Sequence, residues 1–326
     1  MNTLVQLQNN QLINETEIIQ SPNYPFIGGN SFEVTLEHLK NDCIIPVFSK
    51  DNESTISHFQ FINETFSKVK ELFPNESLAA PEIRVSHMIK GRVPSAIGKP
   101  ANQLQEDEKT IYYERCAFII KVHSIKRNIN NNELSLCIGG VRSYNQENLY
   151  SKKTVEKFKL FIGFQNKVCT NLCISSDGFT NEIRVTSAGE IAENFHHLVE
   201  SYNHDEHFSN MELFNDYSIS ETQFAHLIGK IRMYYHMGKE NQKLHFPILL
   251  NDGQINNVVR DYFECPNFKK NNDGSISLWN LYNLFTEANK SSYIDNNLER
   301  NVNVYAFIKN LAKTINSSNN DWYTII

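Results

Sequence analysis

Polar side chains interrupt an apolar, aromatic segment near the C-terminal end of the chain, Asn272 to Arg300. Trp279, Asn283 and Lys290 recur there, with Thr286, at steps of three to four residues, so a helix would place them on one face. An aromatic ring, an amide and an ammonium group on one face can stack on a base and pair with a phosphate. The spacing therefore indicates a ligand-binding face.

A helix end explains the same residues without a ligand. Asn289 would lie at the C-terminal cap, Lys290 would complement the negative end of the helix dipole, and Asp295 or Asn296 would begin the next helix. Both interpretations predict a polar corner from Asn289 to Asp295 that includes Tyr293. Leu278, Leu281, Tyr282 and Phe285 form the opposite stripe, which we expect to be buried.

A second candidate is the most basic local segment, which contains Arg84, Lys90, Arg92 and Lys99, with Glu82 as the opposing charge. It predicts either a contact with an anion or phosphate or a solvated loop. A third candidate is Gln165, Asn166 and Lys167, which follow Gly163 inside a strand pattern. Glycine in a strand indicates a bulge or close backbone approach.

Two possible metal sites fail on their ligands. Cys169 and Cys173, with His196, His197, His204 and His207 nearby, have zinc-like residue types, but positions four apart in a strand lie about 13 Å apart, too far for one metal unless the strand bends. The segment around Gly274 places Lys269 and Asn280 where an EF-hand needs acidic ligands. We expect core thiols, an Asp-Gly turn capped by Ser275 or Ser277, and no metal or cofactor.

Composition narrows the class of protein. The chain has 326 residues, a net charge of -6 and 40% hydrophobic residues, so it can form a substantial core and is not a strongly basic duplex-binding protein. It contains no apolar run long enough for a membrane span and no secretory signal, so its 6 cysteines are expected to be reduced thiols in the cytoplasm. Common catalytic motifs, such as phosphate loops, nucleophile elbows and zinc-protease signatures, are absent from the sequence.

The order of elements predicts an α+β fold. Strand patterns dominate the middle of the chain, where residues 110–125 and the following segment form one hairpin and residues 158–174 and 181–187 form a second. An antiparallel sheet of consecutive hairpins, followed by a helical C-terminal half packed on it, is expected. The predicted regions are a flexible arm (1–30), a strand-helix segment (31–80), a β-rich region (81–187), a helical region (188–315) and a polar tail (316–326), with 81–315 as one domain.

Several long runs then resemble one family. They are SHMIKGRVP, KPANQLQEDEKTIYYERCAFII, LCIGGVRSYN, FKLFIGFQNKVCTNLC, FAHLIGKIRMYYH and SLWNLYNLFTEANKSSYIDNNLERNVNVYAF, in this order over residues 80–312. The chain resembles the Bacteroidota domain of unknown function 3871 family. It is more distantly similar to a larger family of phage- and plasmid-related proteins that share the features at Trp279, Tyr282 and Asn283 and at Tyr293–Asp295. The resemblance implies an intracellular protein of mobile elements and brings no assigned catalytic residue.

Three functional hypotheses follow. The first is a non-enzymatic, nucleic-acid-associated protein that binds or anneals single strands during phage or plasmid replication. The second is an interaction module that acts on a host protein such as a defence factor. The third is an enzyme whose polar site comprises Asn283, Lys290, Tyr293 and Asp295.

Overall fold

The computed structural model describes residues 4–6, 12–14, 25–45, 55–146, 155–317 and 322–324. Its centre is a curled antiparallel sheet built around β5 (Lys109–Ile129), which pairs with β4 (Glu82–Arg92) on one side and β6 (Asn132–Ser143) on the other. The outer strands are β3 (Phe32–Val34) next to β4, and β7 (Glu156–Asn166), β8 (Leu172–Cys173) and β9 (Phe179–Val185) beyond β6. Away from the sheet, β1 (Leu4–Gln6) pairs with β2 (Leu12–Asn14) and β10 (Ser218–Ile219) with β11 (Ile276–Ser277).

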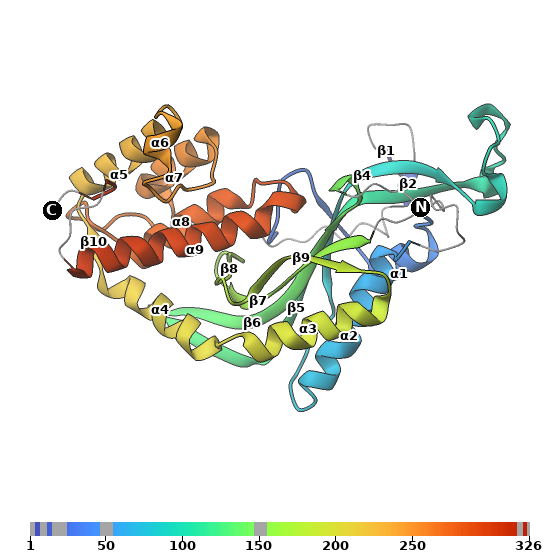
Figure 1. Ribbon diagram of the computed structural model, residues 1–326, viewed down its shortest axis with the longest axis horizontal. Helices are drawn as coiled ribbons and strands as arrows, with labels where there is room; N and C mark the ends of the chain where they lie inside the picture. The colour runs from blue at the N-terminus through green and yellow to red at the C-terminus, as the bar shows by residue number, and fades with distance from the viewer. Residues whose placement is uncertain are drawn as a thin grey trace.

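Helices cover both faces of this sheet (Figure 1). On one face lie α2 (His58–Leu72) and α3 (Ala188–Ser201), and on the other lie α8 (Leu278–Asn289) and α9 (Ile294–Ser317). The β4–β5 hairpin extends beyond these layers as an arm at the opposite end from α5, α6 and α7 (Figure 1). The remaining helices are α1 (Leu36–Asn41), α4 (His204–Asp216), α5 (Glu221–Tyr234), α6 (Lys239–Gln242) and α7 (Asp252–Glu264).

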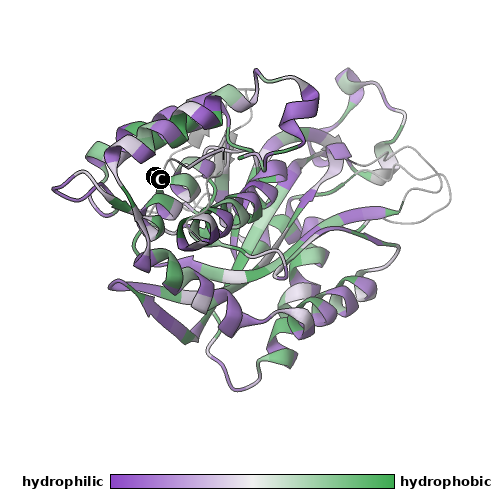
Figure 2. Cartoon of the chain, turned by 60° about the vertical axis from the view of Figure 1, so that its left-hand side comes forward, coloured by the Kyte–Doolittle hydropathy of each residue, from purple (hydrophilic) through white to green (hydrophobic). Residues whose placement is uncertain are grey.

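The near-continuous apolar run in β5 follows from this layering. Phe118 and Ile120 belong to the core beneath α2, whereas Ala117 and Ile119 belong to a second cluster with Ile294 and Leu298 of α9. A strand covered on both faces needs apolar residues at successive positions rather than at every second one. The central strands are accordingly hydrophobic along their length, and hydrophilic residues gather on the outer helix faces (Figure 2).

The predicted α+β architecture is confirmed, and several local predictions hold with it. Both hairpins form, because β5 pairs with β6 and β7 pairs with β9. Ser277, one of the two expected caps, is the N-cap of α8 and accepts from the Asn280 backbone N–H. The stripe Leu278, Leu281, Tyr282 and Phe285 is fully buried.

The expectation of one strand over residues 158–174 is wrong. Strand β7 ends at Asn166, and the backbone N–H of Thr170 donates to the Asn166 carbonyl to close a turn. Thr170 has a φ of 59°, a left-handed conformation that breaks an extended run. Cys169 therefore lies in a turn, and the chain resumes pairing only at β8.

Both ends of the chain contribute to the core, which differs from the predicted arm and polar tail. Phe26 and Ile27 are buried in the cluster beside α9, and Tyr323 is buried with its ring 5.1 Å from that of Phe307. Of the predicted arm, the residues before 25 other than those of the short β1 and β2 strands lie outside the described ranges.

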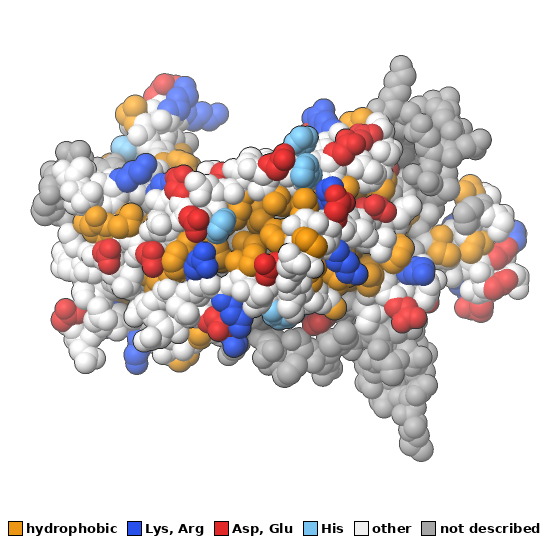
Figure 3. Space-filling view, turned by 90° about the horizontal axis from the view of Figure 1, so that it is seen from below, with side chains coloured by type: hydrophobic (Ala, Val, Ile, Leu, Met, Phe, Trp, Pro, Cys, Tyr) orange, Lys and Arg blue, Asp and Glu red, His pale blue; other side chains and the backbone are white. Residues whose placement is uncertain are grey.

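Three further elements depart from the expectations. The sequence patterns did not predict α4, the last helix begins at Ile294 rather than at Asp295 or Asn296, and β4 continues through Arg92 into the segment expected as a contact or a solvated loop. In the predicted strand-helix segment, Cys43 forms an isolated bridge to Ile111. On the face seen from below, apolar side chains gather along the middle and charged side chains surround them (Figure 3).

Candidate functional site at the corner between α8 and α9

The chain reverses direction between α8 and α9 in a short polar segment, Asn289–Asp295, which we call the corner. Lys290 is the C-terminal cap of α8, and α9 begins at Ile294. The residues around the corner form two groups with different partners. The inner side faces α8, α7 and the turn after β7, and the outer side faces β4 and β5.

On the inner side, Asn283 is fully buried, and both its amide oxygen and its amide nitrogen make hydrogen bonds. Its Oδ1 accepts hydrogen bonds from Nδ2 of Asn166 (3.2 Å) and of Asn171 (3.4 Å), and its Nδ2 donates to the Trp279 carbonyl (3.0 Å). Asn171 also donates to the Asn283 backbone carbonyl at 3.0 Å. These bonds tie α8 to the turn that follows β7.

The corner itself is closed by a reciprocal pair of asparagines. Asn289 Nδ2 donates to the Asn297 carbonyl at 2.9 Å, and Asn297 Nδ2 donates to the Asn289 carbonyl at 3.1 Å. Ser292 Oγ donates to Asn289 Oδ1 at 2.7 Å. Since all three side chains are buried, this exchange ties the end of α8 to the start of α9 and gives a partner to the Asn289 carbonyl, which the helix end leaves open.

Lys290 also belongs to the inner side. Its side chain is buried, and Nζ donates to the Glu287 carboxylate at 2.8 Å and to the Cys169 carbonyl. Gly28 and Gly29 donate their backbone N–H groups to the Lys290 carbonyl at 2.8 and 2.9 Å. A Cβ atom at Gly29 would lie 2.6 Å from the carbonyl oxygens of Ser291 and Ser292, so this close approach requires glycine.

Trp279 has no face open to a ligand, since its side chain is fully buried. It packs against Tyr282, with ring centroids 6.0 Å apart. Thr286 is buried as well and donates its hydroxyl to the Tyr282 carbonyl. The face of α8 that the sequence indicated for ligand binding is therefore part of the interior. Its polar side chains, those of Asn283, Thr286 and Lys290, form hydrogen bonds within the protein.

The outer side is different because two of its aromatic side chains are exposed. Tyr293 is 47% exposed, and its ring lies 6.1 Å from the imidazole of His87, which is also exposed. The guanidinium carbon of Arg115 lies 5.5 Å from the Tyr293 ring centroid, a cation–π distance. Arg115 NH1 approaches His87 Nδ1 at 2.7 Å.

Carboxylates surround this arginine. Asp295 Oδ2 lies 3.5 Å from Arg115 Nε, and Glu114 lies 3.5 Å from Arg115 NH2. Lys159 Nζ donates to the Asp295 backbone carbonyl at 2.7 Å and to the Glu299 carboxylate at 2.6 Å, which fixes the start of α9 on the sheet. Among the described residues, Asp295 Oδ1 and Arg115 Nε are buried atoms that make no hydrogen bond.

The backbone of His87 is strained. Its φ is 57°, although the pairing of β4 with β5 keeps one register on both sides, Ser86 with Arg115 and Met88 with Tyr113. A left-handed conformation costs an ordinary residue about 1–2 kcal/mol, and such strain collects at functional sites. With this backbone conformation, the imidazole of His87 departs from the alternation of side chains along β4 and lies beside Tyr293.

The basic segment does not reach the corner as one patch. Arg84 is buried, donates to Ser31 Oγ (3.2 Å) and to the Ser31 carbonyl (2.6 Å), and has its pKa lowered by burial. Arg92 donates to the Lys99 carbonyl, and Lys99 pairs with Glu108. Lys90 is exposed on β4, three residues beyond His87.

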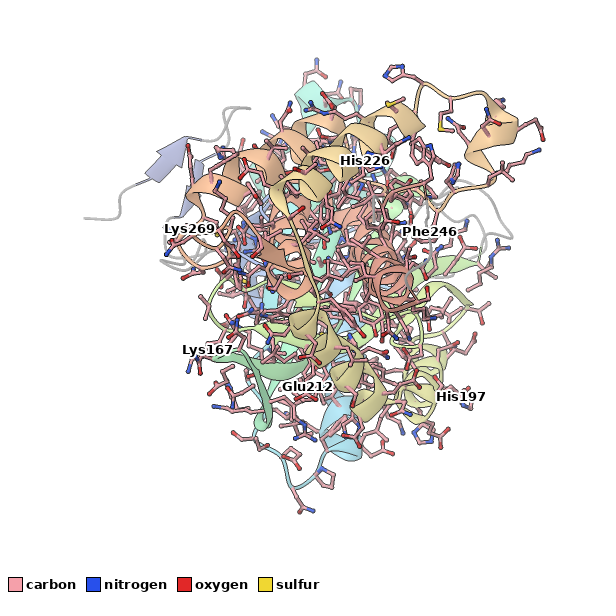
Figure 4. All side chains as sticks on the ribbon, turned by 90° about the vertical axis from the view of Figure 1, so that its left-hand side faces the viewer. Lys167, His197, Glu212, His226, Phe246 and Lys269 are labelled. Atoms are coloured by element: carbon pink, nitrogen blue, oxygen red, sulfur yellow. The ribbon has the colours of Figure 1, made fainter. Side chains whose placement is uncertain are left out.

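The third candidate segment stabilises the turn after β7. Gln165 Nε2 donates to the Thr170 carbonyl at 3.2 Å, and Asn166 donates to Asn283. Lys167 points outward (Figure 4) and lies 3.4 Å from the Glu133 carboxylate. The amides of Gln165 and Asn166 therefore hold the turn that binds Asn283.

Burial governs the chemistry of two of the residues considered for zinc, Cys169 and His207. Burial raises the pKa of Cys169 to about 12 and lowers that of His207 to about 3, and His207 Nδ1 bonds to the Tyr202 hydroxyl at 2.7 Å. Within the described part of the chain, His, Cys, Asp and Glu side chains form no group of three that could hold a metal ion.

The four residues of the hypothetical enzyme site fall into two pairs. Asn283 and Lys290 both contact Cys169 on the inner side, while Tyr293 and Asp295 both contact Arg115 on the outer side. His87 and Arg115 were not among the sequence candidates. The signals that could have identified them are the Ser86-His87 pair and the Glu114-Arg115 pair, polar dipeptides inside strands that are otherwise largely apolar.

The comparisons with known proteins identify a family. The chain matches the family described as "Domain of unknown function, B. Theta Gene description (DUF3871)" over residues 6–324, nearly its whole length, and it belongs to that family. No curated protein and no solved structure matches it. None of the helices in the described residues is long and apolar enough to cross a membrane.

Proposed function

We propose that this chain is a non-enzymatic protein that binds single-stranded nucleic acid through the outer side of the corner, as an accessory of phage or plasmid replication. The observation that supports it is the pair of exposed rings, Tyr293 and His87, beside the Arg115 guanidinium. Stacking on aromatic rings is a sequence-tolerant way to bind unpaired bases, because every base has a flat face.

The charges at this site define the mode of binding. Arg115 is opposed by Asp295 and Glu114, so base stacking rather than phosphate pairing supplies the affinity. Lys90 is the nearest exposed cation along β4 and provides about one phosphate contact. We therefore expect a weak salt dependence, a slope of about -0.7 in log K against log salt for one phosphate on a single strand.

Fluorescence anisotropy with a labelled single-stranded oligonucleotide tests this proposal. Removing one stacked aromatic ring costs about 1–3 kcal/mol, so Tyr293→Ala should weaken binding roughly 5- to 150-fold. Phe263→Ala is the matched control, because Phe263 is an aromatic side chain of similar exposure, 52% against 47%, on α7. Absence of binding at micromolar protein in low salt, or equal affinity of the Tyr293→Ala protein, would contradict the proposal.

A second candidate function, contact with a host protein, is favoured by a different surface. Met233, Leu244, Phe246 and Leu249 expose 41–75% of their areas at the end of α5 and in the segment after α6. Phe246 lies at this outer edge (Figure 4). Exposed apolar side chains gathered in one segment are typical of protein-binding surfaces. Capture of a host protein that is lost in a Leu244→Asp, Phe246→Ser variant, while oligonucleotide binding persists, would favour this function.

A further inference from the structure

A cavity of about 600 Å³ lies among α5, α7 and α9 on the inner side of the corner. This volume is within the range of small-molecule sites, about 300–1,000 Å³. Its apolar wall consists of Ile231, Leu250 and Ile255, each only 1% exposed. Its polar groups come from Arg232, Tyr235, His236, Asn251, Asp252 and Arg300.

Arg300 is held at this cavity by neutral partners. Its NH1 donates to Ser292 Oγ at 2.7 Å and to Gln254 Oε1 at 3.2 Å. Over the described residues it has no carboxylate within ion-pair distance, even though its side chain is half-buried. A charged group withdrawn from water without a counter-charge is unfavourable, and a bound anion would remove that cost.

The other charges of the cavity do not neutralise Arg300. Asp252 is paired with Arg232, whose Nε lies 2.9 Å from Asp252 Oδ1, and Arg232 also donates to Asn256. Two arginines and one aspartate leave one excess positive charge, which belongs to Arg300. The Tyr235 hydroxyl donates to the Ile248 carbonyl, so this ring forms a fixed aromatic wall.

Gln254 fixes Arg300 in this position. It is buried, and its Oε1 accepts from both Arg300 and the Asn251 backbone N–H. Its Nε2 lies within hydrogen-bond distance of the Ala288 carbonyl (3.1 Å) and of Ser292 Oγ (2.9 Å). One side chain thus links the start of α7, the end of α8 and Arg300, so the cation is positioned before any ligand arrives.

We propose that this cavity binds a small organic anion, with a phosphate or carboxylate on Arg300 and an apolar or aromatic body against Ile231, Leu250 and Ile255. The site is separate from the outer side of the corner and does not depend on the proposed nucleic-acid binding. Its specificity comes from one charge-assisted contact with Arg300 beside the apolar wall of the cavity.

Isothermal titration of the full chain with phenyl phosphate, benzoate and the neutral benzyl alcohol tests this proposal. We expect saturable binding of at least one of the two anions, at least tenfold tighter than any binding of the alcohol. Binding of phenyl phosphate but not of benzoate would indicate that the ligand carries a phosphate. Equal binding of the two anions would indicate that the site accepts organic acids in general. Arg300→Gln should weaken anion binding at least tenfold, because it removes the charge and keeps a donor amide.

Arg260→Gln is the matched control, since it removes an exposed arginine from α7 that pairs with Asp261 and lies outside this cavity. It should bind the anion as the unmodified chain does. Arg300→Lys checks the same point if Arg300→Gln fails to fold, because it keeps the charge and should retain most of the affinity. No saturable binding by either anion, or unchanged binding by a folded Arg300→Gln protein, would overturn the proposal.

Discussion

The two sides of the corner hold polar and aromatic side chains in different physical states. On the inner side, Asn283, Asn289 and Lys290 are buried and bonded to groups of the protein itself. On the outer side, Tyr293 and His87 are exposed and the His87 backbone is strained. Buried polar groups that bond within the protein stabilise a fold, whereas exposed or strained groups are the ones available to a ligand.

The histidines extend this comparison and give the largest expected effect, on stability against acid. His58 is fully buried, its ring Nε2 donates to the Tyr113 carbonyl at 2.9 Å, and burial, followed by the nearby Arg142, lowers its pKa to about 3. Burial lowers the pKa of His207 to about 3 as well. Both must lose this environment before they can gain a proton near neutral pH.

The sign of the pH effect follows from these lowered values. In the unfolded chain these histidines bind protons near pH 6.5, and in the folded chain only near pH 3. Their contribution to the free energy of unfolding is therefore complete above pH 6.5 and is lost as the pH falls. At pH 5 each of the two histidines should lower the free energy of unfolding by about 2 kcal/mol, or about 4 kcal/mol together. Urea unfolding at pH 7 and pH 5 measures this loss.

Two variants test the assignment to buried histidines. His58→Gln keeps a donor for Tyr113 and should remove about half of the pH-dependent loss, relative to its own stability at pH 7. His197→Gln changes a histidine whose side chain is 78% exposed and should leave the loss unchanged. An equal pH dependence in all three proteins would show that these buried groups do not govern acid stability.

The next largest effect concerns the inner network. Asn283→Ala leaves the Nδ2 groups of Asn166 and Asn171 without their Oδ1 acceptor in the interior, and it opens a small cavity. We expect a loss of about 3 kcal/mol in the free energy of unfolding. Asn280→Ala, on the same helix but only half-buried, should change it by about 0.5 kcal/mol or less. Similar losses for the two variants in urea unfolding would show that the buried amide network of Asn283 stabilises the fold no more than a half-buried amide on the same helix.

The sequence predicted the elements better than it predicted the site, for a physical reason. Hairpins and caps depend on neighbours in the chain, so β-branched alternation and a serine before the apolar stripe of α8 sufficed to predict them. Burial of Trp279 depends on distant elements, because α4, α7 and α9 all pack against α8. A helix that is covered on almost every side leaves no face for its polar residues to present.

The outer side could be predicted only in part. Tyr293 and Asp295 were recognisable because they follow a helix and break its apolar pattern. Their partners His87 and Arg115 lie about 200 residues earlier and meet them only because α9 packs across β5 and β6. Such long-range approach has no periodic signal in the sequence. The strained φ of His87 has none either.

The smallest expected effect tests whether that strain has a function. His87→Gly relieves a left-handed conformation that costs about 1–2 kcal/mol, and the added freedom of glycine in the unfolded chain offsets about 0.5–1 kcal/mol of this gain. We therefore expect a net stabilisation of about 0.5–1 kcal/mol in urea unfolding. Lys90→Gly, in ordinary extended backbone on the same strand, should instead destabilise the protein by about 0.5–1 kcal/mol.

Oligonucleotide binding by the same His87→Gly protein completes the test. A variant that is more stable yet binds less tightly would mean that β4 retains a strained histidine because the ring beside Tyr293 contacts the ligand. A gain in stability with unchanged affinity would leave the strain without a role in binding and would restrict the proposed surface to Tyr293 and Arg115. Loss of stability would instead show that the contacts of the His87 ring with Arg115 outweigh the backbone strain.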